Sequence, residues 1–400
     1  MIEAPSRPNQ PVYLDNQATT RCDPRVAAVM MPWFTEHYGN PASVEHVMGR
    51  AAEAAVESAR EQVAALLGAD PREIVFTSGA TESNNIAIKG AARHGRLHGT
   101  PDVEARKRII TVATEHKCVL ESVSDLRHEG FEPVFLPVRP DGVLDPDALI
   151  EALKTPTLLV SVMAVNNETG VIQDIAGLAA IAKAAGALFH SDIAQAAGKI
   201  PLDLTAAKID LASVSGHKIY GPKGIGALFV RRRPRARVAA LFSGGGQERG
   251  IRSGTLAAPL IVGLGEACRL AAADMHADAI RIAGLRDRLL EKLRAAIPDL
   301  IINGSLTSRI PGNLNISFPR ATAAAMLARM PDLCVSTGSA CSSAEIEPSY
   351  VLRALGLTDD AAGRTLRIGI GRFTSPADID FAAAALIAAH QGEPQRTEAT

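Results

Sequence analysis

A lysine follows a short apolar strand pattern near the middle of the chain. The apolar run spans residues 210–214, and Ser215, His217 and Lys218 come directly after it. Lysine is rarely fully buried unless it is paired, so a lysine at the end of a buried strand needs a reason. One reason is covalent attachment of an aldehyde cofactor as an imine. The alternative is an exposed lysine just past the strand, and the residues around Lys218 leave both interpretations open.

Four other predicted strands also end in polar side chains. These groups lie at 78–83, 114–116, 166–168 and 192–195. Each group by itself has an ordinary explanation, such as a helix N-cap or a polar loop. In a mostly parallel sheet, however, ligands bind beyond the carboxyl ends of the strands, which meet at one edge. We therefore expect these side chains to form one site with Lys218.

The cofactor pyridoxal 5'-phosphate has requirements that these side chains meet. Its pyridine nitrogen needs an anion, which Asp192 supplies, and its ring needs a flat partner, for which His116 is suited. Lys218 would carry the cofactor and, once freed, move protons at the substrate. The remaining expected contacts are to the phosphate from Ala80, Thr81, Ser215 and His217, and to the phenolic oxygen from Gln195 or Asn167.

Two other phosphate-binding motifs are excluded. Gly216 and Gly221 have the separation of a Walker A motif, but Pro222 follows where that motif requires lysine. A G-x-G-x-x-G fingerprint joining a first strand to its helix is also lacking.

A cysteine lies late in the chain within a run of small residues, STGSACSS at 336–343. Cysteines in cores usually behave as inert small hydrophobes, but Cys341 in this setting is presented to solvent or to a site. A catalytic role and an incidental loop thiol both stay open from this context. The five cysteines form an odd set without C-x-x-C spacing, so neither a disulfide framework nor a zinc ribbon is predicted. We interpret Cys118, close to His116, as a core thiol.

Composition and charge argue against several classes of function. The 400-residue chain carries 42 Lys and Arg against 43 Asp and Glu, a net charge of −1, so we expect no nucleic-acid or anionic-membrane partner. We expect no membrane span, signal peptide or dedicated metal site, and the cysteine usage suits a cytoplasmic protein. The one basic run, RRRPRAR at 231–237, is expected to be a solvated strand end and turn, with docking of an acidic partner as the alternative.

The chain pattern predicts the elements that position these residues. Apolar strands are predicted at 73–77, 108–113, 133–138, 157–164, 187–190, 211–214 and 226–230. Helical patterns lie between most of them, and this alternation is typical of an α/β fold with a mostly parallel sheet covered on both faces. We also expect one helix from residue 24 to about 38, and a long helix from 256 to about 297 that leads into a second domain of mixed strands and helices.

Taken together, these motifs resemble the cysteine desulfurases of the NifS/IscS type, which belong to the class-V aminotransferase group of fold-type-I pyridoxal-phosphate enzymes. The resemblance covers nearly the whole chain, from YLDNQATT at 13–20 to LRIGIGRFTS at 366–375. The motifs between these ends are GNPAS, EIVFTSGATESNN, ATEHK, VNNETG, HSDIAQ, SGHKIYGPKGIGAL, GGGQERGIRSGT, STGSACSS and EPSYVLRALG. One departure is Gly369, two residues after Arg367, where serine is common in the family.

The resemblance implies a fold and a division into domains. It implies a large cofactor-binding domain at 24–262, with a mostly parallel seven-stranded sheet flanked by helices. It implies a smaller α+β domain formed by residues 1–23 and 263–400, which carries a catalytic cysteine loop at about 333–345.

The resemblance also implies a reaction and a role for each site residue. The reaction removes sulfur from L-cysteine, releases L-alanine and leaves a persulfide on Cys341. Lys218 is implied as the cofactor lysine, His116 as a ring-stacking residue that takes part in acid–base steps, and Asp192 as the partner of the pyridine nitrogen. The substrate carboxylate is implied to contact Arg367, Asn167 and Asn40, and Thr255 is implied to reach the phosphate in the other subunit of a homodimer.

The resemblance leaves the sulfur acceptor open. Iron–sulfur scaffold proteins, thio-cofactor pathways and tRNA thiolation all receive sulfur from similar enzymes, and Cys341 could ligate a cluster transiently during transfer. The alternatives are a selenocysteine lyase or an aminotransferase on the same scaffold, and a scaffold protein without catalysis. An aminotransferase would share Lys218 and Asp192 but would not need Cys341.

Overall fold

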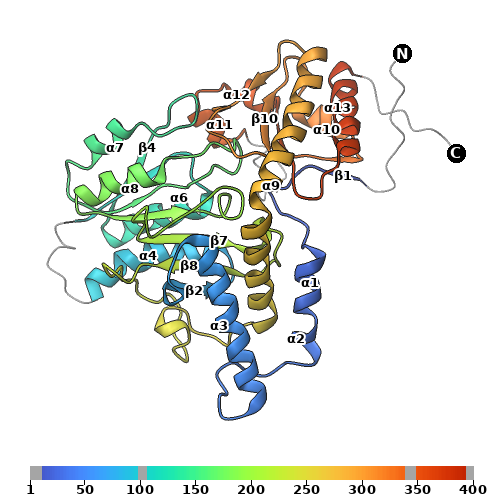
Figure 1. Ribbon diagram of the computed structural model, residues 1–400. Helices are drawn as coiled ribbons and strands as arrows, with labels where there is room; N and C mark the ends of the chain where they lie inside the picture. The colour runs from blue at the N-terminus through green and yellow to red at the C-terminus, as the bar shows by residue number, and fades with distance from the viewer. Residues whose placement is uncertain (1–10, 98–105, 338–347, 393–400) are drawn as a thin grey trace.

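The computed structural model describes residues 11–97, 106–337 and 348–392 (Figure 1). Cys341 and most of the predicted cysteine loop lie outside these ranges. The described chain forms a large sheet with helices on both faces and a second, smaller sheet with its own helices.

The large sheet has seven strands in the order β2-β8-β7-β6-β5-β3-β4. They are β2 (Ile74–Thr77), β3 (Arg108–Val112), β4 (Glu132–Leu136), β5 (Thr157–Ser161), β6 (Leu188–Asp192), β7 (Leu211–Ser215) and β8 (Gly226–Val230). Strand β8 runs antiparallel to both neighbours, and the other pairs are parallel. The predicted fold class, a mostly parallel seven-stranded sheet within an α/β fold, is confirmed.

The described helices cover the large and the small sheet and connect the two regions. They are α1 (Pro24–Met30), α2 (Pro32–Thr35), α3 (Val47–Leu67), α4 (Ala80–Leu97), α6 (Lys117–Asp125), α7 (Pro146–Ala152), α8 (Ile175–Ala184), α9 (Ala258–Ala296), α10 (Ala323–Arg329), α11 (Tyr350–Ala354), α12 (Asp359–Gly363) and α13 (Pro376–Gln391). Short 3-10 turns are η1 (Pro71–Glu73), η2 (Leu126–Glu129), η3 (Gly216–Lys218) and η4 (Glu248–Gly250).

Both faces of the large sheet are buried. In β2, Ile74 and Phe76 pack into the core shared with α3, α8 and α9, whereas Val75 packs on the opposite side with α4. Residues of α4 and α6 cover the same opposite face near β3 and β5. Alternate side chains of a strand point to opposite faces, so continuous apolar strands such as β2 require helices on both sides.

The smaller region is built on β9 (Ile301–Ile302), β10 (Asn313–Ser317) and β12 (Thr365–Gly369), which form an antiparallel sheet in the order β12-β10-β9. The first strand of the chain, β1 (Val12–Tyr13), pairs in parallel with β11 (Leu333–Cys334) beside it. The N-terminal residues therefore contact the C-terminal part of the chain.

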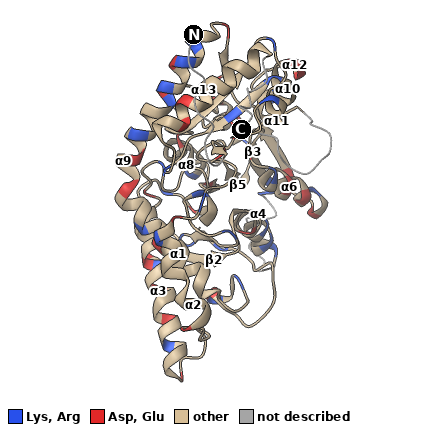
Figure 2. Cartoon of the chain, turned by 90° about the vertical axis from the view of Figure 1, so that its right-hand side faces the viewer, with Lys and Arg blue, Asp and Glu red and all other residues tan. Residues whose placement is uncertain are grey.

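Helix α9 belongs to both regions. Its first half contributes Ile261 and Leu264 to the core of the large sheet, and its second half contributes Leu289 and Leu293 to the core of the small one. The predicted boundary between residues 262 and 263 falls inside this helix, and the division into domains stays a prediction. Figure 2 shows acidic and basic residues interspersed along α9, as expected for a helix with a solvated side.

The single helix predicted from residue 24 to about 38 was wrong. The chain forms two shorter helices, because α1 ends at Met30 and α2 begins at Pro32. Proline has no N–H to donate and its ring clashes with the preceding helical turn, so it starts a helix more readily than it continues one.

The described helices include none that is long and apolar enough to cross a membrane. Across residues 11–97, 106–337 and 348–392, His, Cys, Asp and Glu side chains form no group of three suited to a metal ion.

Candidate active site

Lys218 lies at the end of η3, directly after β7, in contact with the N-terminal segment of the chain. Its Nζ donates hydrogen bonds to the carbonyl oxygens of Gln17 at 2.5 Å and Ala18 at 2.6 Å. The backbone N–H of Thr20 donates to the carbonyl of His217 at 2.9 Å, which fixes this segment beside the turn. The turn needs glycine at 216, because a Cβ there would lie 2.9 Å from the carbonyl oxygen of Pro222.

Asp192 ends β6 and is almost fully buried. Its Oδ1 accepts a hydrogen bond from the N–H of Ala194 at 2.9 Å, and its Oδ2 accepts one from Nδ2 of Asn84 at 2.7 Å. Asn84 lies on α4 and also donates to the sulfur of Cys118 at 3.2 Å. These contacts hold one carboxylate orientation, which suits an anion that must face a pyridinium nitrogen.

His116 is the N-cap of α6 and is held by Cys118. Its Nδ1 accepts the backbone N–H of Cys118 at 3.2 Å and lies 3.0 Å from the Cys118 sulfur. Because Nδ1 is an acceptor, the ring proton of neutral His116 is on Nε2. Burial lowers the pKa of His116, the Asp192 carboxylate opposes this, and the positive charge of Lys218 adds to the lowering. His116, Asp192 and Lys218 are thus close enough to interact electrostatically, as the sequence predicts.

Cys118 is a structural thiol at this position. Burial raises its pKa to about 12, and the Asp192 carboxylate adds to this rise. The thiol therefore stays protonated near neutral pH and can donate to His116. This agrees with its interpretation as a core cysteine and adds a contact that the sequence did not indicate.

The predicted phosphate contacts gather at the N-terminus of α4 and the end of β7. Ala80 and Thr81 begin α4, whose first N–H groups have no intrahelical acceptor. Ser215 is buried at the end of β7. A Cβ on Gly226 would approach the Gly79 Cα to 2.6 Å, so β8 and the turn before α4 pack backbone against backbone.

His217 lies beside this cradle as a neutral side chain. Its Nδ1 contacts the hydroxyl of Thr19 at 3.0 Å. Burial lowers its pKa to about 4, and the charges of Lys218, Lys223 and Lys199 add to the lowering. A neutral histidine can offer one N–H donor to a phosphate.

Arg367, in β12, brings the small sheet to the site. Its guanidinium donates to Oδ1 of Asp15 at 2.8 Å and to the carbonyl of Asn167 at 3.2 Å. Nε of Arg367 and Oδ1 of Asn167 are both buried and have no hydrogen-bond partner among the described residues. Unpaired buried polar atoms are costly, and the Nε donor of Arg367 is suited to a ligand carboxylate, whereas Oδ1 of Asn167 is an acceptor and is suited to a ligand donor.

Gln195 completes the part of the site near Lys218. Its Nε2 donates to the carbonyl of Gln17 at 2.8 Å, the same oxygen that Lys218 contacts. Its Oε1 accepts from Nζ of Lys199 at 2.7 Å.

Two predicted residues are not brought into this cluster. Thr255 is exposed between η4 and α9, and Asn40 is exposed before α3, where its Oδ1 accepts the N–H of Ala42 at 2.9 Å. Cys341 cannot be placed, since it lies outside the described residues.

The residues present fit pyridoxal phosphate. An amine, an oriented buried carboxylate, an imidazole and a helix N-terminus meet at one sheet edge, and each supplies a different part of what the cofactor requires. When bound, the cofactor supplies an electron sink for a carbanion at the substrate Cα.

A family model described as "Aminotransferase class-V" matches residues 12–381. The chain belongs to the class-V aminotransferase family. Its use of pyridoxal phosphate, predicted from the residues and from the resemblance, is therefore confirmed.

Named relatives are similar to this protein along almost the whole chain. "Cysteine desulfurase" of Homo sapiens is 53% identical over 372 residues, which is 93% of this chain and 80% of the relative. "Cysteine desulfurase IscS" of Rickettsia felis is 51% identical over 377 residues, 94% of this chain and 90% of the relative. A solved structure titled "NIFS-LIKE PROTEIN" has a TM-score of 0.86 at 35% identity and covers 94% of this chain and 98% of its own. The resemblance to NifS/IscS-type enzymes is confirmed.

Several residues that make contacts in the candidate active site were not predicted from the sequence. Lys199 was not singled out, and Asn84, Asp15 and Gln17 were quoted only as parts of motifs. The motif DNQATT could have indicated Asp15 and Gln17, because a polar run after a short strand is typical of a site. Lys199 carried no local signal, since a lysine four residues after Gln195 resembles any surface lysine.

Proposed function

We propose that this protein is a pyridoxal-phosphate-dependent cysteine desulfurase that converts L-cysteine to L-alanine and transfers the sulfur to Cys341 as a persulfide. The observation that carries the proposal is the buried, incompletely paired Arg367 beside the Lys218, His116 and Asp192 cluster. A guanidinium suited to a carboxylate, near an amine suited to an aldehyde cofactor, supports a reaction on an amino acid. The names of the similar proteins, "Cysteine desulfurase" and "Cysteine desulfurase IscS", support the choice of reaction.

Each side chain has a task in this reaction. Arg367 binds the substrate carboxylate through its fork of N–H donors, with Asn167 at its side. Lys218 removes the proton from the substrate Cα as a neutral amine and returns protons later. Neutral His116, with its proton on Nε2, can donate at the ring face.

Cys341 receives the sulfur. As a thiolate, it attacks the substrate sulfur, the carbon–sulfur bond breaks, and the electron pair stays with the carbon fragment that becomes L-alanine. The outer sulfur of the persulfide then passes to an acceptor thiol. A sulfur that must visit both a buried site and a partner requires a carrier on a loop.

The test is sulfide release from L-cysteine in the presence of a reducing thiol, measured with Cys341→Ser. We expect this variant to lose release while keeping the visible absorbance of the bound cofactor, because Lys218 and Asp192 are unchanged. Full sulfide release by Cys341→Ser would exclude the persulfide route. Wild-type protein that releases no sulfide but transfers the amino group of L-cysteine to a 2-oxo acid would favour an aminotransferase. Purified protein that gains no absorbance with added cofactor would favour a non-catalytic scaffold. Faster turnover of L-selenocysteine, with little release from L-cysteine, would indicate a selenocysteine lyase.

We further propose a homodimer in which Thr255 contacts the phosphate in the partner's site. The exposure of Thr255 in a single chain, after a glycine-rich segment, supports this. The test mixes Lys218→Ala and Thr255→Ala subunits. If Thr255 serves the other subunit, one site of each mixed dimer combines both defects and the other is intact, so activity returns above that of either parent. Activity that only averages the parents would contradict the proposal.

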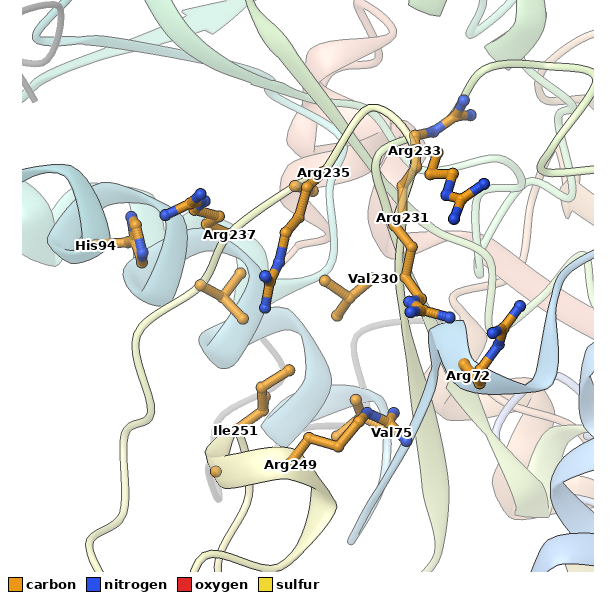
Figure 3. Close-up of a pocket in the computed structure, with 14 residues that line it drawn as sticks. Arg72, Val75, His94, Val230, Arg231, Arg233, Arg235, Arg237, Arg249 and Ile251 are labelled. Atoms are coloured by element: carbon orange, nitrogen blue, oxygen red, sulfur yellow. The ribbon is translucent and has the colours of Figure 1, made fainter.

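We propose that an acidic acceptor, such as an iron–sulfur scaffold protein, docks on the basic run at 231–237. This run borders a hollow of about 510 Å³ that is also lined by Arg72, His94 and Arg249. In Figure 3, Arg235 extends from the turn at 231–237 toward the hollow, and Arg249, which donates to the carbonyl of Ile74, lies on the side of η4. Arg235 and Arg237 are exposed, and their side chains have no ion pair with any part of the chain that the structure describes. Unpaired arginines are suited to an acidic surface.

The docking test reverses charge in Arg235→Glu/Arg237→Glu. Sulfur transfer to an acidic acceptor should fall, whereas sulfide release to a small thiol should stay unchanged, because these residues are remote from Lys218. The matched control is Arg139→Glu, on an exposed arginine elsewhere. Equal loss in both variants would contradict a specific docking surface.

We also propose a cytoplasmic location. The free cysteines Cys22, Cys118, Cys268 and Cys334 support it, and cell fractionation tests it.

A further inference from the structure

Lys199 lies beside the active site but has no task in the reaction above. It follows β6 by a few residues and is largely buried, and its Nζ donates a hydrogen bond to Oε1 of Gln195 at 2.7 Å. Burial lowers the pKa of Lys199 from 10.5 to about 7, and the positive charges of Lys218 and Arg367 add to this. A lysine that is kept in such an unfavourable place requires a reason.

The hydrogen bonds of Gln195 fix the orientation of its side-chain amide. Nζ of Lys199 donates to the atom of Gln195 that faces it, and that atom is the carbonyl oxygen. The amide nitrogen then points the opposite way, toward the carbonyl of Gln17, to which it donates at 2.8 Å. Both ends of the amide therefore agree on the same orientation.

The Gln17 carbonyl connects this pair to Lys218. The Lys218 amine donates to that oxygen at 2.5 Å, so the contacts run from Lys199 through Gln195 and Gln17 to Lys218. Gln195 is also the residue expected beside the phenolic oxygen of the cofactor. If the N–H groups of the Gln195 amide face Lys218, one of them can donate a hydrogen bond to the phenolic oxygen of the cofactor. If the amide were flipped, its carbonyl oxygen would face that phenolic oxygen and repel it.

We propose that Lys199 is a positioning residue of the desulfurase: it fixes the Gln195 amide so that the N–H groups face Lys218 and the cofactor. The inference rests on the proposed function for the reaction that Lys199 assists. The hydrogen bonds that link Lys199, Gln195 and Gln17 do not depend on that function.

Charged and titratable neighbours face Lys199 from several elements. Lys218 and Arg367 are the cations, and Tyr220 and Asp278 line the small cavity of about 40 Å³ next to it. Asp278 is paired with Arg372 at 2.8 Å and with Arg281 at 3.3 Å, so its charge is compensated. The hydrogen bond to Gln195 is thus the contact through which Lys199 acts.

The first test compares Lys199→Met, which keeps an unbranched side chain without donor or charge, with Lys199→Arg. We expect Lys199→Met to lower kcat about 10- to 100-fold with little change in KM, the loss expected for a hydrogen bond to a charged group. Lys199→Arg should restore part of the rate. The matched control is Lys183→Met, on a half-buried lysine that pairs with Asp210 elsewhere, and it should keep the wild-type rate.

Two further measurements separate positioning from general stability. The double variant Gln195→Ala/Lys199→Met should be no slower than Gln195→Ala, because Lys199 acts through Gln195. In cofactor-free protein, acetylation of Lys218 followed by peptide mass spectrometry reports its pKa. Lys199→Met should move the midpoint of labelling to higher pH, since a nearby positive charge disfavours protonation of Lys218.

A wild-type rate and an unchanged Lys218 labelling midpoint in Lys199→Met would overturn the proposal, as would additive losses in the double variant. If Lys199→Met does not fold, Lys199→Gln takes its place in each measurement. If the wild-type protein releases no sulfide, the proposed function fails, while the labelling of Lys218 still shows whether the charge of Lys199 acts on Lys218.

Discussion

The buried ion pair of Arg60 and Glu248 allows a quantitative prediction. Both side chains are at most 4% exposed, and the guanidinium of Arg60 makes two hydrogen bonds of 2.8 Å to the carboxylate. The carboxylate also accepts the backbone N–H of Phe76 at 2.7 Å. Glu248 and Arg249 hold positive φ angles of 48° and 58°, a conformation that costs a non-glycine residue about 1 kcal/mol or more. The pair therefore fixes a strained turn that leads toward Thr255.

Breaking this pair from one side leaves a buried charge without its principal partner, since Arg60 would keep only the exposed Glu57 at 3.0 Å. Such a loss costs about 3–5 kcal/mol. We expect Arg60→Met and Glu248→Gln each to lower the free energy of unfolding by this amount. The double variant removes both charges and keeps an acceptor for Phe76, so its loss should be at least about 2 kcal/mol smaller than the sum of the single losses. Urea unfolding of the cofactor-free protein, followed by the fluorescence of the single tryptophan, Trp33, measures these values.

The control for this series is Arg288→Met. Arg288 pairs with Asp380 at 2.6 Å, but both side chains are more than a third exposed. An exposed pair contributes about 0–1 kcal/mol, so this variant should change little. Additive single losses at Arg60 and Glu248, or a loss at Arg288 of the same size, would refute the reasoning.

Three further predictions concern the site and the sheet beneath it. Arg367→Lys keeps the charge but loses the fork of donors, so the KM for L-cysteine should rise about tenfold or more with a smaller change in kcat, measured by steady-state sulfide release. Asp192→Asn should lower kcat about 100-fold, because the anion facing the pyridine nitrogen is lost; an unchanged kcat would contradict its role. Burial lowers the pKa of His190 from 6.5 to about 3, so the unfolded state binds more protons between these values and stability falls as pH drops from 6.5 toward 3. His190→Asn should flatten this part of the stability profile in urea titrations at fixed pH values.

Sequence patterns were sufficient to predict the strands of the large sheet, because each strand is marked by an apolar run of consecutive residues. Apolar runs separated by helical spacing predicted all seven strands of the large sheet, with ends that differ from the observed ones by three residues or fewer. The polar groups after these strands could be assigned to one edge, since parallel strands bring their carboxyl ends together. Short elements were missed: β9 has only two residues and α12 only five, which is too little for periodicity to show.

The sequence by itself determined the type of chemistry: an amine at Lys218, an anion at Asp192, an imidazole at His116 and a thiol at Cys341, each in a recognisable motif. Only the tertiary structure decided how these groups are held. Asn84 joins Asp192 to Cys118, and Gln17 lies 178 residues from Gln195 along the chain, yet the two are hydrogen-bonded. Such contacts depend on how strands and helices pack, and periodicity or spacing along the chain does not encode which distant side chains will meet. For that reason Lys199 looked like a surface lysine in the sequence and is a largely buried neighbour of the active site in the fold.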